Sequence, residues 1–253
     1  MEVHVYTNPG WFSCRTLEEF LTSNGVQYEH HDLATDQPAR DYLENKGVKA
    51  VPVTVIDDDE VIIGYYPRKL IPALNLTIEP DLSGKTNWLS EKYNAIIQAT
   101  NRAALQLSSE QLQQMVAWRP ETLRDTIMHI LSFPELAWRS HEHGSMSTDD
   151  MKACKDRLQH IVAPASIAEY GDQVRHDVTE FLSSGKDESF DRVVPAHYGG
   201  EVTVVELLNI ILSHSTHHLK QVYWFMETEL GVKPENPASP KDFEGIITPE
   251  KLI

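Results

Sequence analysis

The sequence predicts two domains, a small α/β domain followed by an all-α helical bundle. The chain has 253 residues, more than the roughly 100 to 150 of a typical single domain. Short apolar runs alternate with helical patterns over residues 1–75, whereas residues 87–230 show helical periodicity throughout. Between them, residues 76–86 are rich in Thr, Pro, Asp, Ser and Gly, which is typical of a linker. A proline-rich tail is expected at 231–253.

The first domain is expected to follow the order βαβαββ. Strands are predicted at 3–6, 28–33, 51–56 and 61–65, and helices at 15–24 and 37–46. A strand, helix and strand in succession imply a right-handed parallel crossover. The turn Asp57-Asp58-Asp59 between the last two strands implies an antiparallel hairpin. Together these units describe a small thioredoxin-type sheet.

The second domain is expected to be a bundle built on four long helices. Helical segments are predicted at 87–107, 109–116, 121–139, 149–161, 165–183 and 203–230. Gly171 weakens the prediction of the fifth segment. The tail contains Pro234, Pro237, Pro240 and Pro249, which exclude a regular helix there. We expect the tail to wrap around the surface of the bundle.

Composition excludes several classes of protein. A formal net charge of -16, with no cluster of Lys and Arg to offset it, argues against binding to nucleic acid or to a membrane surface. No apolar run approaches the roughly 20 residues of a membrane span, and the first residues do not resemble a secretory signal. We therefore expect a cytoplasmic protein. Its two cysteines, Cys14 and Cys154, fall in different predicted domains and are expected to be reduced thiols.

The turn at residues 6–14, Tyr-Thr-Asn-Pro-Gly-Trp-Phe-Ser-Cys, runs from a predicted strand into a predicted helix. With Val51-Pro52 further along, it resembles the glutaredoxin family over roughly residues 1–74. In that family the turn carries Cys-x-x-Cys or Cys-x-x-Ser, and the first Cys is a nucleophile activated by the helix N-terminus. The apolar face of the helix places Trp11 at the first position and Cys14 at the second. The other register, with Cys14 first, would leave Gly25 inside the helix.

The resemblance therefore implies a thiol-binding domain without the usual attacking thiol. Pro52 aligns with the cis-proline of the family, and the implied thiol-binding residues are Trp11, Val51, Pro52, Gly64 and Tyr65. Ile63 stands where many glutathione-using members have a glycine. Two interpretations of Cys14 stay open, an inert buried thiol and a catalytic thiol that exchanges disulfides.

Histidines recur on the apolar faces of two predicted helices. His214 and His218 are four residues apart and lie on one face, close enough to share a metal ion. His129 lies on the apolar stripe of another long helix and is the expected third ligand. His217 falls off the stripe, so we expect it, with Gln221, to support the ligands rather than bind the metal.

The motifs around these histidines resemble the DinB-like superfamily over roughly residues 86–235. They are Trp-Arg-Pro-Glu-Thr-Leu at 118–123, Met-His-Ile at 128–130 and Leu-Ser-His-Ser-Thr-His-His at 212–218. The resemblance implies a four-helix bundle in which His129, His214 and His218 hold a divalent metal. Lys220 departs from the Arg or Gly usual at its position. Three imidazoles tolerate zinc, nickel, iron or cobalt.

Better understood members of that superfamily are S-transferases or isomerases that use low-molecular-weight thiols. The resemblance thus implies a metal-dependent thiol S-transferase or isomerase acting on a small-molecule thiol, such as glutathione, and an electrophile. The first domain would recognise the thiol. Two alternatives stay open, a redox protein that uses Cys14 and a non-catalytic fusion that binds metal and a partner protein. A homodimer is a candidate assembly because related bundles often dimerise.

Overall fold

The computed structural model describes residues 1–8, 11–48, 50–78, 85–197 and 200–249. It divides into two compact units, residues 1–81 with 196–202 and residues 82–195 with 203–253. The predicted fold class, a thioredoxin-like α/β domain followed by a helical bundle, is confirmed. The predicted linker at 76–86 and tail at 231–253 stay predictions, because residues 79–84 and 250–253 lie outside the described ranges.

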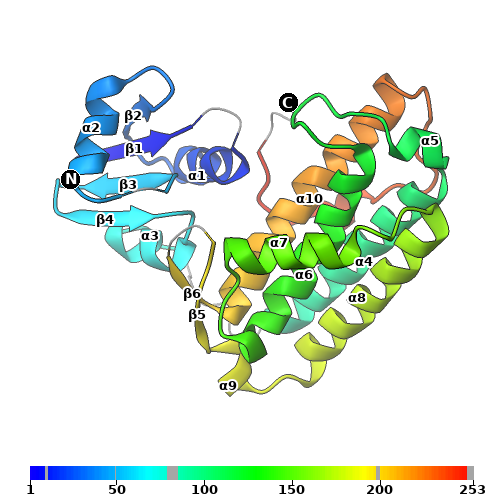
Figure 1. The fold of residues 1–253 in the computed structure, drawn as a ribbon. Helices are drawn as coiled ribbons and strands as arrows, with labels where there is room; N and C mark the ends of the chain where they lie inside the picture. Colours follow the sequence, from blue (N-terminus) through cyan, green and yellow to red (C-terminus); the bar gives the residue numbers. More distant parts are fainter. Residues whose placement is uncertain (9–10, 49, 79–84, 198–199, 250–253) are drawn as a thin grey trace. The chain divides into compact units, whose positions relative to one another are not determined.

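The first unit is built on a four-stranded sheet (Figure 1). Its strands are β1 (Val3–Thr7), β2 (Glu29–Asp32), β3 (Val53–Ile56) and β4 (Glu60–Ile63). Their spatial order is β2-β1-β3-β4, with β1 parallel to β2 and antiparallel to β3, and β3 antiparallel to β4. The predicted parallel crossover and terminal hairpin are therefore both present. Every residue of β3 is buried, as expected for an apolar inner strand.

Three helices accompany the sheet, α1 (Phe12–Ser23), α2 (Gln37–Asn45) and α3 (Pro67–Ala73). Helix α1 begins three residues before the predicted start, with Trp11 as its N-cap. Helix α3 was not predicted from the sequence. Pro67 occupies the first turn, where a missing backbone N–H costs no helical hydrogen bond.

Four long helices form the second unit and confirm the predicted bundle. They are α4 (Thr86–Leu105), α6 (Leu123–His143), α8 (Pro164–Ser184) and α10 (Val204–Thr228). Helix α4 packs on α8 and α10, and α6 packs on the same two helices. Helices α6 and α10 each begin with a capping box, at Thr122 and Thr203, which defines the start of both histidine-bearing helices.

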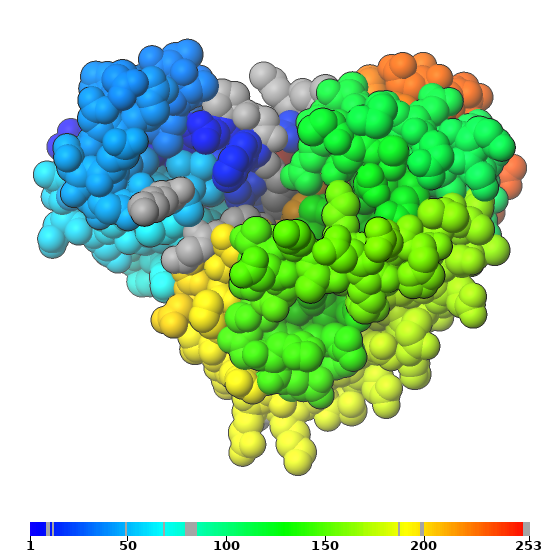
Figure 2. Space-filling view, viewed as in Figure 1, coloured from blue at the N-terminus to red at the C-terminus, as the bar shows by residue number. Residues whose placement is uncertain are grey.

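Short elements complete the chain: α5 (Ser109–Leu112), α7 (Thr148–Leu158), α9 (Asp187–Phe190), β5 (Val193–Pro195), β6 (Glu201–Thr203) and α11 (Pro240–Phe243). Helix α7 packs on α6 and is mostly exposed, on the face that Figure 2 shows in space-filling form. The four-residue helix α11 corrects the prediction of a tail without helix. Within the tail, the carbonyl of Lys241 accepts a hydrogen bond from Lys92 Nζ of α4 at 2.7 Å. In the described part of the chain, no helix is both long and apolar enough to cross a membrane.

Gly171 lies where α8 passes α4. A Cβ at this position would come within 2.0 Å of Asn101 Oδ1 on α4, far closer than van der Waals contact permits. The glycine that weakened the helix prediction therefore allows the two helices to approach closely.

Candidate metal centre

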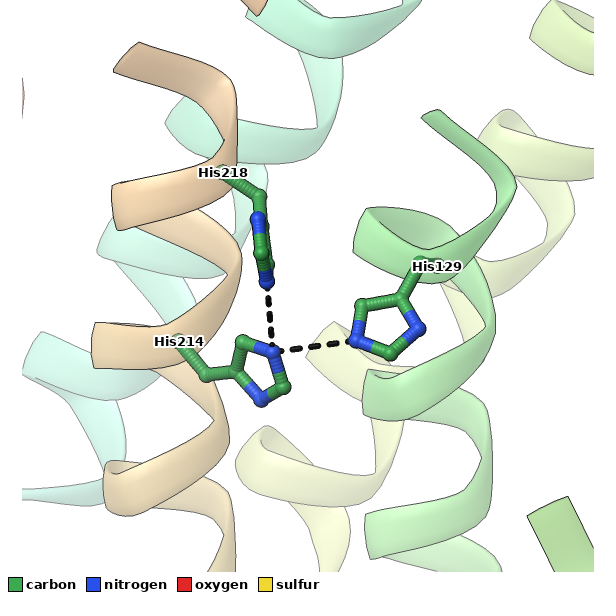
Figure 3. Close-up of side chains that lie close together, drawn as sticks. All are labelled: His129, His214 and His218. Atoms are coloured by element: carbon green, nitrogen blue, oxygen red, sulfur yellow. Dashed lines mark hydrogen bonds between the residues drawn. The ribbon is translucent and has the colours of Figure 1, made fainter. Parts of the chain in front are cut away.

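Three imidazoles converge inside the helical bundle. His129 comes from α6, and His214 and His218 come from successive turns of α10 (Figure 3). His214 Nε2 lies 3.0 Å from His129 Nε2 and 2.8 Å from His218 Nε2. All three nitrogens lie within 4.8 Å of one another. The structure thus brings together the three residues that the sequence predicted as metal ligands.

The hydrogen-bonding capacity of neutral imidazoles favours a cluster that binds a metal ion over one held together by hydrogen bonds alone. The Nε2 atom of a neutral imidazole carries either one proton or one lone pair, so His214 Nε2 alone cannot make two good hydrogen bonds with its neighbours. A divalent ion would accept lone pairs from all three rings at once. Metal–nitrogen bonds of about 2.0 to 2.1 Å in tetrahedral geometry place ligand nitrogens about 3.3 Å apart, near the observed separations. The arrangement therefore fits a three-histidine metal centre.

Burial keeps His218 in the form that binds metal. Its pKa lies well below the usual value for histidine, chiefly because burial penalises the imidazolium, and the nearby positive charge of Arg119 acts in the same direction. A neutral imidazole is the species that donates a lone pair to a metal. For His218, we therefore expect protons to compete with a metal ion only below the ordinary range of histidine titration.

Gln221 determines which nitrogen of His218 carries the proton. Its Oε1 atom lies 2.6 Å from His218 Nδ1, and an amide oxygen can only accept. The Nδ1–H group therefore donates to Gln221, and Nε2 keeps its lone pair on the side of His129 and His214. This contact is the geometry that the predicted supporting role of Gln221 requires.

His217 is buried beside the cluster but does not join it. Its ring lies edge-on to that of His218, with 5.6 Å between centroids. Phe133, one turn after His129 on α6, packs more closely. The centroid of its ring lies 3.8 Å from that of the His129 ring and 5.0 Å from that of the His214 ring. The sequence did not single out Phe133 as a residue of the site. Its spacing of four residues from His129 was the signal for this contact.

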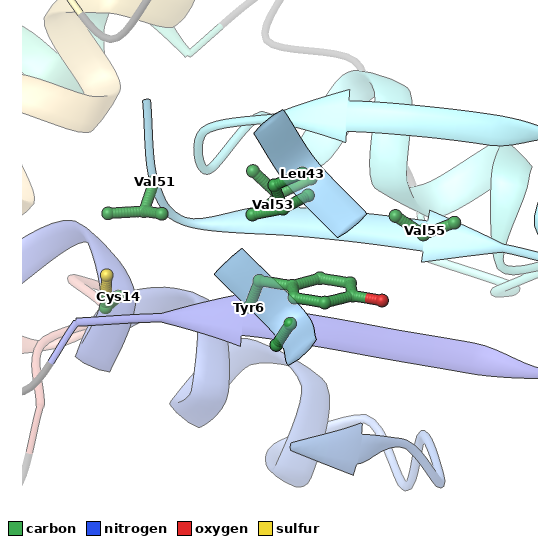
Figure 4. Close-up of a cluster of buried hydrophobic side chains, with 7 residues drawn as sticks. Tyr6, Cys14, Leu43, Val51, Val53 and Val55 are labelled. Atoms are coloured by element: carbon green, nitrogen blue, oxygen red, sulfur yellow. The ribbon is translucent and has the colours of Figure 1, made fainter. Parts of the chain in front are cut away.

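Cys14 lies in the buried core of the first unit. Its side chain is 1% exposed and packs in a cluster with Val51 and Val53 (Figure 4). Burial raises the pKa of its thiol to about 11, although the Asn8 backbone N–H donates to Sγ at 3.5 Å. The position at the helix N-terminus thus does not produce a thiolate here, which supports the inert interpretation of Cys14.

The other predicted thiol-binding residues are mostly buried as well. The Val51–Pro52 peptide bond is cis, as the resemblance implied. The Pro52 carbonyl accepts a hydrogen bond from Gly64 N at 2.7 Å, and Val51 and Tyr65 are buried. Of the five predicted residues, only Trp11, at 53% exposed, presents its side chain to solvent.

We predict that Cys14 reacts slowly with thiol reagents in the folded protein. With its pKa raised to about 11, the Cys14 thiol has a thiolate fraction near pH 8 that is roughly 100-fold below that of an ordinary cysteine, and burial adds a steric barrier. Labelling with iodoacetamide, followed by mass spectrometry of the Cys154→Ser variant, isolates this thiol. The same variant in denaturant should react rapidly. Fast labelling of the native variant would contradict the prediction and restore the redox interpretation.

Both parts of the chain match known protein families. Residues 93–222, just over half of the chain, match the family model of the DinB superfamily, and residues 3–62 match the glutaredoxin model. The protein belongs to the DinB superfamily and carries a glutaredoxin-like domain at its N-terminal end. Both predicted resemblances are confirmed.

Individual proteins are similar to parts of this chain. The Gene 56 protein of Mycobacterium phage D29 is 38% identical over 69 residues, which are 27% of this chain and 77% of that protein. The Gene 56 protein of Mycobacterium phage L5 is 35% identical over 69 residues, 27% of this chain and 67% of that protein. The structure of YfiT from Bacillus subtilis, described as a probable metal-dependent hydrolase with an unusual four-helix bundle topology, superposes with a TM-score of 0.50 and 14% identity. It covers 62% of this chain and 92% of YfiT.

Proposed function

We propose that this protein is a metal-dependent enzyme that joins a low-molecular-weight thiol, such as glutathione, to an electrophilic carbon, or isomerises a substrate through such a thiol. The observation that carries the proposal is the convergence of His129, His214 and His218 through their Nε2 atoms. Three neutral imidazoles leave at least one coordination position for a substrate or water, as catalytic rather than structural sites do. Zinc is the first candidate metal, with nickel and iron as alternatives.

The chemistry of the proposed transfer balances without an external oxidant. A bound divalent ion would lower the pKa of a thiol and so supply a thiolate at neutral pH. The new carbon–sulfur bond forms as the bond from carbon to the leaving group breaks, and the thiol proton departs with that group. Gln221 holds the proton of His218 on Nδ1, and Phe133 restrains the rings of His129 and His214.

The glutaredoxin-like domain has a supporting role in this proposal. Cys14 is buried and its pKa is raised, which argues against a disulfide-exchange reaction at that residue. Exposed Trp11, at the start of α1, offers an aromatic face to a ligand where the family has its nucleophile. We propose that this domain recognises the thiol rather than oxidising or reducing it.

Hydrolysis is a second candidate function. YfiT, whose fold resembles the bundle, is described as a probable metal-dependent hydrolase. A metal held by three histidines also lowers the pKa of bound water, which would supply hydroxide for ester or amide cleavage. The two candidates therefore share a metal centre and differ in the nucleophile.

Conjugation of thiols to a model electrophile tests the proposal. We expect the purified full chain to accelerate the reaction of a small thiol with 1-chloro-2,4-dinitrobenzene, to lose this activity after treatment with a chelator, and to regain it with zinc, nickel or ferrous iron. The Cys14→Ser variant should keep the activity. Conjugation that survives metal removal would overturn the proposal. Metal-dependent cleavage of a nitrophenyl ester without conjugation would favour the hydrolase.

A further inference from the structure

A second group of metal-binding side chains lies on the sheet of the first unit, far along the sequence from the bundle histidines. It consists of His4 on β1 and Glu29 and His31 on β2. The parallel register pairs His4 with Glu29 and Tyr6 with His31. Because alternate side chains along a strand point to the same face, this register gathers the two histidines and the carboxylate on one face of the sheet.

The three side chains are close enough to share one ion. His4 Nδ1 lies 3.1 Å from His31 Nε2. Glu29 Oε2 lies 3.7 Å from His4 Nδ1, and Glu29 Oε1 lies 3.7 Å from His31 Nε2. These separations bracket the roughly 3.3 Å expected between neighbouring ligands of a tetrahedral zinc ion.

The outer nitrogens of both rings face carboxylates. His4 Nε2 lies 3.2 Å from Glu2 Oε1, and His31 Nδ1 lies 3.1 Å from Asp36 Oδ2. Metal-binding histidines commonly donate their second N–H to a carboxylate, which orients the ring and increases the basicity of the ligand nitrogen. Asp36 is itself held as the N-cap of α2 by the backbone N–H of Ala39 at 3.0 Å. Both rings are therefore presented with their inner nitrogens facing each other.

Packing also restrains His31. Its ring stacks on Tyr6 with 4.6 Å between centroids and an interplanar angle of 14°. Glu29, by contrast, has a side chain that is 64% exposed, so an ion could enter from solvent on its side. The carboxylates of Glu2, Glu29 and Asp36 would attract a cation to this face.

We propose that His4 Nδ1, His31 Nε2 and the Glu29 carboxylate form a second metal site, for a divalent transition metal such as zinc. Two imidazoles and a carboxylate are a ligand set that zinc accepts, with further coordination positions left to water or another ligand. This site is separate from the bundle centre and does not depend on the proposed catalytic function.

Zinc stoichiometry of the full chain tests the second site. Isothermal titration with zinc, checked by elemental analysis after gel filtration, is expected to find two zinc ions per wild-type chain. His31→Ala should bind one, and Glu29→Gln should weaken one of the two sites at least tenfold. The matched control is His30→Ala, because His30 is the intervening residue of β2 and lies 2.7 Å from Thr7 Oγ1 on the other face of the sheet. This control should bind two.

A separate variant distinguishes zinc bound in the bundle from zinc bound on the sheet. His218→Ala should lose the other zinc ion and keep the one on the sheet, and the His31→Ala/His218→Ala double variant should bind none. Glu29 is exposed, so Glu29→Gln tests the site even if a histidine variant folds poorly, and circular dichroism checks each fold. Two tight sites in both His31→Ala and Glu29→Gln would overturn the proposal, as would a single wild-type site that disappears in His218→Ala.

Discussion

Replacing His218 with alanine is expected to empty the metal centre of the bundle and to abolish any activity that depends on it. Only His129 and His214 would remain as ligands, and Gln221 would lose the ring that it orients. A metal present at 100 times its dissociation constant stabilises a folded protein by about 2.7 kcal/mol, and this increment should disappear. Elemental analysis and the zinc-dependent rise in melting temperature measure the two effects. The His31→Ala background removes the contribution of the sheet site.

Two substitutions close to His218 test whether the loss of metal is specific to the three ligands. His217→Gln changes a buried histidine that lies beside the cluster but outside it, so it should retain the metal. Gln221→Ala leaves the three imidazoles in place and removes the partner of His218 Nδ1, so we expect metal affinity to fall about 10- to 100-fold. If His218→Ala bound metal as tightly as the wild type, the assignment of the centre would be wrong.

The second large effect is expected at Glu135, which holds three helices together. Its carboxylate is buried on α6 and accepts hydrogen bonds from Arg157 Nη2 of α7 at 2.8 Å and from Tyr170 Oη of α8 at 2.5 Å. The pKa of Tyr170 is raised by burial and by this negative charge. Glu135→Ala would leave the Tyr170 hydroxyl without its acceptor, and we expect the free energy of unfolding to fall by about 3 kcal/mol. Unfolding in urea at fixed metal concentration measures this loss.

Two variants serve as controls for Glu135. Glu142 lies on the same helix with its side chain 58% exposed, so Glu142→Ala should change the free energy of unfolding by less than about 0.5 kcal/mol. Tyr170→Phe removes one hydrogen bond and leaves the carboxylate paired with Arg157, so a loss of about 1 kcal/mol is expected. Equal losses for Glu135→Ala and Glu142→Ala would show that the buried network contributes nothing specific.

Local patterns in the sequence were enough to predict the two fold classes, the parallel crossover, the closing hairpin and the four long helices. Periodicity over ten or more residues reports which face of an element is buried, whatever its neighbours are. The spacing of His214 and His218 is of this kind, because one helix places them on the same face. The short elements α9, β5 and α11 lie within no longer periodic run and were missed.

Other features depend on distances between elements and on burial, which a linear pattern does not contain. The rotation of α6 that brings His129 to His214, and the strand register that places His4 beside His31, follow from packing and pairing across the fold. Cys14 stands near a helix N-terminus, which favours a low pKa, yet desolvation in the core outweighs this effect. The sequence alone therefore identified the three bundle histidines and the two cysteines as candidates. Three-dimensional packing brought His4, Glu29 and His31 together as well, and determined that the Cys14 thiol and the His218 imidazole are buried in their neutral forms.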